Sequence, residues 1–117
     1  MTNLARTAVL LLGYLGAVAS QTAVGARLAD YRKEIDAVDR QIVELLNKRG
    51  SIVQKVGELK REAGLPIAVP DRERQVLENI VAAGKSGPLP APTLRRIYAS
   101  ILQEMRVWEA GDTLERK

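Results

Sequence analysis

The sequence predicts an all-α protein with one long N-terminal helix and two shorter helices. Three observations predict this fold class. Apolar residues recur at alternating spacings of three and four from Leu28 onward, and no stretch alternates as a strand would. Proline and glycine cluster at two places, 64–70 and 84–92. The chain of 117 residues has no Phe, so its core must be built from Leu, Ile, Val and Ala, a composition typical of packed helices.

Residues 1–26 form a leader that differs from the rest of the chain. Arg6 is followed by twenty uncharged residues, and the mostly apolar stretch 7–19 ends in the small-x-small pattern Ala17-Val18-Ala19. This is the layout of a secretory signal peptide. An uncleaved membrane anchor and a disordered or misassigned start are the alternatives. We expect a periplasmic or secreted protein if 1–19 is a signal peptide, and a cytoplasmic one otherwise.

Residues 27–111 are expected to form the functional helical domain, with 112–117 as a C-terminal tail. Its first helix should run from about Leu28 to Gly64, which is roughly 35 residues or 50 Å. So long a helix cannot be covered by its own short chain. Its apolar seam therefore predicts a second copy running antiparallel, in a homodimer.

The two shorter helices are bounded by turn residues. Pro70 followed by Asp71 predicts the start of the second helix, which should run to about Ala83. The third helix should begin at about Thr93, with that residue as N-cap, and should end at Gly111.

Composition excludes several kinds of chemistry. The chain has no Cys and no His, which removes disulfides, thiol nucleophiles, imidazole bases and the usual zinc and haem ligands. We therefore expect no metal and no cofactor. The formal charge of +4 suits an anionic metabolite or a nucleic acid. Acids alternate with bases along the long helix and leave no plain basic stripe, so we do not expect nucleic-acid binding.

Cations interrupt the apolar seam of the long helix. Arg49 falls on a heptad position of the seam, and Lys60, three helical turns later, points the same way to within about 20°. Buried cations need a carboxylate or a bound anion. A salt bridge across the dimer, for instance with Asp39 or Glu44, is the structural alternative. The anion-binding interpretation gains from Arg72, which begins the second helix where the helix dipole adds anion affinity.

The charged and apolar residues follow three spaced motifs, which cover about 80 of the 117 residues. These are Leu28-x3-Arg32-x2-Ile35-Asp36-x2-Asp39-x2-Ile42-x2-Leu45-Leu46-x2-Arg49, then Val56-Gly57-x2-Lys60, then Arg72-Glu73-x3-Leu77. Together they resemble the chorismate mutases of the all-helical class. The resemblance implies a three-helix protomer in an intertwined antiparallel homodimer, with two sites that each take residues from both chains.

The resemblance also implies an isomerase that converts chorismate to prephenate in aromatic amino acid biosynthesis. Arg49 and the partner subunit's Arg32 would grip the two carboxylates of chorismate, and Lys60 would donate to the ether oxygen and to a carboxylate. Within one chain Arg32 lies about 40 Å along the helix from Lys60, too far to share a small ligand. Glu73 would hold the ring hydroxyl, and Arg72 would line the site.

Three further positions follow from the same resemblance. Glu109 falls where the family places a Gln or Glu that faces the ether oxygen, so we expect Lys60, Glu109 and Arg49 to be catalytic. Facing a developing anion, Glu109 helps only when protonated, and the rate should fall as pH rises; a solvated acid at the helix end is the alternative. Val69 replaces an Asp of many relatives and Met105 replaces a small polar residue, and both are expected to line the pocket.

Two rival functions stay open at this point. An isochorismate-pyruvate lyase could use the same cationic clamps on a related helical dimer, because that elimination also needs no base. A non-catalytic basic helical interaction module is the alternative of a different class.

Overall fold

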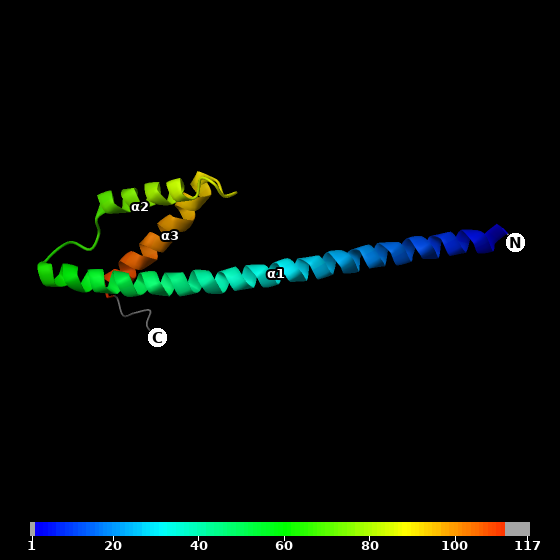
Figure 1. Ribbon diagram of the computed structural model, residues 1–117, viewed down its shortest axis with the longest axis horizontal. Coiled ribbons are helices and arrows are strands. Elements are labelled where there is room, and N and C mark those ends of the chain that lie inside the picture. Colours follow the sequence, from blue (N-terminus) through cyan, green and yellow to red (C-terminus); the bar gives the residue numbers. More distant parts are fainter. Residues whose placement is uncertain (1, 112–117) are drawn as a thin grey trace. The chain divides into compact units, whose positions relative to one another are not determined.

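The protein consists of three helices (Figure 1). The computed structural model describes residues 2–111, with side chains at position 18 and from 20 onward, so the expected tail 112–117 lies outside the described residues. Helix α1 spans Thr2–Ala63, α2 spans Pro70–Ala83 and α3 spans Ala91–Glu109. Residues 2–111 contain no strand. The predicted all-α fold with one long first helix is therefore confirmed.

Helix α1 begins earlier than expected. It starts at Thr2, whereas the periodicity predicted a regular helix from about Leu28. No proline occurs before Pro66, so nothing in the sequence stops the helix from extending back through the leader. Removal of the leader stays a prediction. Among the described residues, no helix is both long and apolar enough to span a bilayer.

The chain divides into two compact units, residues 1–44 and 45–117. In the first unit, the described part of α1 carries an apolar series that is about half exposed, at Leu28, Tyr31, Ile35, Val38 and Ile42. The second unit holds the end of α1 together with α2 and α3. Its buried core residue is Leu102 of α3.

The end of α1 is set by a glycine, as the sequence predicted. Gly64 has a φ of 66°, a conformation that costs a residue with a Cβ about 1–2 kcal/mol. The Leu65 N–H donates to the Lys60 carbonyl at 2.8 Å, which is the hydrogen bond between the first and sixth residues of a Schellman motif. The chain therefore reverses at Gly64, and the loop beyond it brings α2 back toward α1 within the second unit.

Helix α2 begins as predicted at Pro70, which needs no hydrogen-bond acceptor for its ring nitrogen. Val69 stands at the N-cap and offers no side-chain acceptor to the first turn. Asp71 and Glu73 lie in that turn, where negative charge is favoured by the helix dipole. The helix ends at Ala83, and the Gly84 N–H donates to the Ile80 carbonyl at 3.0 Å.

Helix α3 starts two residues before the predicted position. Ala91 is its first residue and Pro90 its N-cap, so the prediction that Thr93 caps this helix was wrong. Pro92 fits inside the first turn, because the backbone N–H groups there have no partner within the helix. The C-terminal end is as predicted, since Gly111 has a φ of 74° and stops the helix.

Candidate active site

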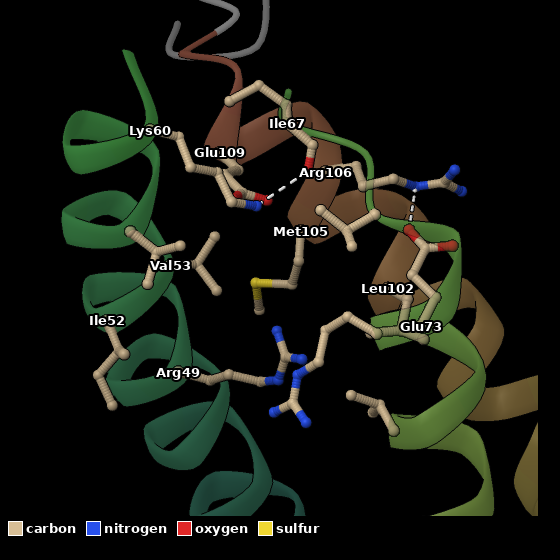
Figure 2. A pocket seen from close by; sticks show the side chains of 14 residues that line it. Arg49, Ile52, Val53, Lys60, Ile67, Glu73, Leu102, Met105, Arg106 and Glu109 are labelled. Carbon is tan, nitrogen blue, oxygen red and sulfur yellow. Dashed lines mark hydrogen bonds and ion pairs between the residues drawn. The ribbon is translucent and has the colours of Figure 1, made fainter. Parts of the chain in front are cut away.

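A pocket of about 320 Å³ lies in the second unit, where all three helices meet (Figure 2). Its volume is at the lower end of the range for small-molecule sites. Four cations and two carboxylates line it, an excess of two positive charges: Arg49, Lys60, Arg72 and Arg106 with Glu73 and Glu109. The lining also includes Val69 and Met105. Each site residue predicted from the sequence, apart from Arg32, therefore lines this one pocket.

Helix α1 contributes the two seam cations. Arg49 and Lys60 both line the pocket, which agrees with the predicted common direction three turns apart. Arg49 has no ion pair or hydrogen bond with any described residue of the chain. In Figure 2 its guanidinium points into the pocket. Within the described chain Arg49 is therefore available to bind an anion, and the alternative of a salt bridge across a dimer stays a prediction.

Lys60 is held by two acceptors from different segments. Its Nζ lies 2.5 Å from Glu109 Oε1 and donates to the Ile67 carbonyl at 2.9 Å. The side chains of Lys60 and Glu109 are 19% and 11% exposed, so water screens this pair weakly. An ammonium group has three N–H donors. One donor of Lys60 is therefore left for another acceptor in the pocket.

Glu109 is buried, and its position is fixed through its backbone as well as its side chain. Arg61 Nη1 donates to the Glu109 carbonyl at 2.7 Å, and the neighbouring Trp108 Nε1 donates to the Gly50 carbonyl at 2.8 Å. A Cβ at Gly57 would lie 2.4 Å from the Glu109 carbonyl oxygen. Glycine at position 57 therefore permits the contact between α1 and the end of α3. The alternative that Glu109 is a solvated acid at the helix end is wrong.

Helix α2 contributes Arg72 and Glu73 from its first turn. Arg72 Nη1 donates to Gln75 Oε1 at 2.8 Å, so its hydrogen-bond partner is a neutral amide. The Glu73 Oε1 lies 3.1 Å from Arg106 Nε of α3. Since Lys60 and Arg106 pair with the two carboxylates, Arg49 and Arg72 have no carboxylate partner among the described residues.

Arg106 is a site residue that the sequence reasoning missed. It follows Met105, which was predicted to line the pocket, but its partner Glu73 lies 33 positions earlier on another helix. Helical spacing relates residues within one helix and carries no signal for such a pair. The crossing of α2 and α3 alone brings the two side chains together.

Two apolar side chains also line the pocket. Val69 and Met105 line the pocket, as predicted. In Figure 2 the Met105 thioether lies between the Lys60–Glu109 pair and the Arg49 guanidinium. Arg32 belongs to the first unit and does not line this pocket in the described chain. Its role in the site of a second copy stays a prediction.

The chemistry of this pocket suits a small dianion. Two arginines can bind carboxylates in a bidentate manner, and a fixed ammonium can stabilise charge that develops on an oxygen. Among the described side chains, no group of three or more acidic residues is arranged to hold a metal ion.

Comparison with known proteins agrees with this interpretation. A model of the chorismate mutase type II family matches residues 31–110. The bifunctional chorismate mutase/prephenate dehydratase of Aquifex aeolicus is 42% identical over 78 residues, which are 64% of this chain and 22% of that protein. The chorismate mutase of Methanocaldococcus jannaschii is 39% identical over 54 residues, 46% of this chain and 54% of that protein. The chain thus spans about a fifth of the Aquifex protein and about half of the Methanocaldococcus protein.

Solved structures show the same likeness over nearly their whole length. The form II structure of chorismate mutase from Thermus thermophilus has a TM-score of 0.70 and 37% identity, and the match covers 74% of this chain and 97% of that one. The form I structure has a TM-score of 0.64 and 39% identity, covering 68% and 98% of the two chains.

Replacement of Gly57 by alanine tests the contact that places Glu109. We expect Gly57→Ala to lower the free energy of unfolding by about 1–3 kcal/mol, because the added Cβ would overlap the Glu109 carbonyl oxygen. The matched control is Gly50→Ala on the same helix, where a Cβ would make an ordinary contact of 3.7 Å with Trp108. Denaturant unfolding at one protein concentration measures both. Equal stability of the two variants would show that α3 does not approach α1 at Gly57.

Proposed function

The chain belongs to the chorismate mutase type II family, and on that premise we propose that it is an isomerase that converts chorismate to prephenate. The reaction is a step of aromatic amino acid biosynthesis. The observation that carries the proposal is a pocket in which Arg49 and Arg72 have no carboxylate partner among residues 2–111, while Lys60 and Glu109 are paired in the same lining.

The charges of the pocket match those of the substrate. Chorismate carries two carboxylates, and two lining arginines, Arg49 and Arg72, have no carboxylate partner among the described residues. Arg49 and the partner subunit's Arg32 bind the two carboxylates, and Arg72 adds positive charge at the start of α2. Bidentate clamps of this kind hold the substrate in the conformer whose reacting atoms are close together.

The rearrangement itself needs no proton transfer and no covalent intermediate, because bonds break and form in one pericyclic step. The absence of His and Cys from the chain therefore removes nothing that the reaction requires. Negative charge grows on the ether oxygen as its bond to carbon breaks. The remaining N–H donor of Lys60, whose side chain is 19% exposed, stabilises that charge.

Glu109 assists only as the neutral acid. A carboxylate would repel the developing charge on the ether oxygen, whereas a protonated carboxyl donates a hydrogen bond to it. Its carboxyl lies 2.5 Å from Lys60 Nζ, so both groups can face the same substrate oxygen.

A second copy of the chain completes the site in this proposal. Apolar residues of α1 are exposed in both units, among them Leu28 and Ile42 in the first, and Leu45 and Leu59, each 64% exposed, in the second. Such a series needs a covering surface, and an antiparallel copy of α1 offers one of the same pattern. The pairing also brings the partner subunit's Arg32 to this pocket.

The lining also suggests a limit on turnover. The side chains of Val69 and Met105 offer no hydrogen bond to the substrate, and both line the pocket. The ring hydroxyl is then held by Glu73 alone among the described acids of the pocket. We infer a modest rate compared with relatives that have polar groups at these positions.

An assay of chorismate disappearance with product identification tests the function. The full chain should consume chorismate and form prephenate, and Arg49→Ala or Lys60→Met should lower kcat/KM roughly 100- to 1,000-fold. Lys55→Met is the control, because Lys55 is an exposed lysine of α1 outside the pocket. Release of pyruvate from isochorismate without prephenate formation would instead identify a lyase.

Mixing two inactive variants tests the shared site. Arg32→Ala and Arg49→Ala should each abolish most activity alone. Random exchange of subunits at equal concentration makes half of the dimers mixed, and each mixed dimer has one site with both arginines. The mixture should therefore recover about a quarter of the parental activity. No recovery after confirmed subunit exchange would place both arginines in a site formed by a single chain.

Substitution of Glu109 tests its role as a hydrogen-bond donor. Glu109→Gln should keep kcat/KM within about tenfold of the parent, since an amide donates a hydrogen bond as the neutral acid does. Glu109→Ala should lower kcat/KM roughly 100- to 1,000-fold, because it removes the donor. Steady-state kinetics measure both variants. Equal losses for the two variants would remove the Glu109 hydrogen bond from the mechanism.

A further inference from the structure

We propose that Arg106 is a positioning residue for substrate binding, which acts by holding the Glu73 carboxylate away from the arginines that bind the substrate. The inference rests on the proposed function, because it assigns Glu73 to the ring hydroxyl. It starts from the ion pair between α2 and α3, in which Arg106 Nε lies 3.1 Å from Glu73 Oε1.

The neighbours of Glu73 make such a partner necessary. Arg49, Lys60 and Arg72 line the same pocket, and each would attract a free carboxylate on a flexible side chain. Pairing of Glu73 with Arg49 or Arg72 would neutralise a group that the substrate carboxylates require. In Figure 2 the Glu73 carboxylate is turned toward Arg106 and not toward the Arg49 guanidinium.

The ion pair leaves Glu73 able to bind a hydroxyl. Arg106 contacts Oε1, and the second oxygen has no partner among the described residues. A carboxylate accepts hydrogen bonds on both oxygens, so Oε2 remains for the substrate. The Glu73 side chain is 30% exposed and that of Arg106 is 44% exposed. The pair therefore lies at the rim of the pocket, where a substrate can reach Glu73.

Because position 69 is a valine, binding of the substrate hydroxyl depends more strongly on the orientation of Glu73. It lines the pocket beside Glu73 with an apolar side chain and offers no second acceptor for a hydroxyl. If the Glu73 side chain turned away from the substrate hydroxyl, no neighbouring acid at position 69 could accept the hydrogen bond in its place. Arg106 thus affects substrate binding through Glu73 without touching the reacting atoms.

A double-mutant cycle of Arg106→Met and Glu73→Gln tests the proposal. We expect Arg106→Met to lower kcat/KM about tenfold, within the range for residues coupled by direct contact. The loss should come mainly from a higher KM, because the hydroxyl contact exists in both the ground state and the transition state. In the Glu73→Gln background the same substitution should cost less than about twofold, since no carboxylate remains to be held.

Two controls accompany the cycle. Arg96→Met removes an exposed arginine of α3 that forms no ion pair with another described residue, and it should leave kcat/KM unchanged. Arg106→Lys retains the charge and should stay within about threefold of the parent. If Arg106→Met does not fold, Arg106→Gln takes its place in the cycle.

The outcomes separate the inference from the function. An equal loss of kcat/KM in both backgrounds would mean that Arg106 supports packing of α2 on α3, and it would overturn the proposal. An unchanged kcat/KM for Arg106→Met would overturn it as well. A parent chain that forms no prephenate would instead refute the proposed function, before any variant is compared.

Discussion

The end of α3 lies against α1 at Gly57, and the geometry of the pocket depends on this close approach. A side chain at Gly57 would reach the Glu109 carbonyl oxygen, so the two helices meet through backbone. Two hydrogen bonds join the same helices on either side of Gly57. Arg61 of α1 donates to the Glu109 carbonyl, and Trp108 of α3 donates to the Gly50 carbonyl. Glu109 is therefore placed through its backbone as well as through the contact of its carboxyl with Lys60, and both side chains are held at low exposure.

This packing decides which cations of the pocket are paired with a carboxylate. Two cations are paired with the two lining carboxylates, and the remaining two arginines have no acid within the described chain. Arg49 is half-buried and Arg72 is exposed, so water can solvate both in the free protein. Both arginines therefore stay available for a dianionic ligand.

Helix α1 carries both an exposed apolar series and two cations of the pocket. We expect the apolar series to pack against a partner helix, and Arg49 and Lys60 interrupt that series at the pocket. A chain of this length gains a large buried surface by pairing, more than its own short helices can supply. In the proposed dimer, the interface and the substrate site are therefore built from the same helix.

The sequence by itself determined the local features. Alternating apolar spacing and turn chemistry at Gly64, Pro70 and Gly111 specify helices, because these signals act between residues close in the chain. The common direction of Arg49 and Lys60 follows from helix geometry in the same way. Only the tertiary structure decided the Arg106–Glu73 pair and the fixing of Glu109 beside Lys60. Those contacts join residues 33 to 49 positions apart on different helices, and their geometry depends on how the helices cross, which no local pattern encodes.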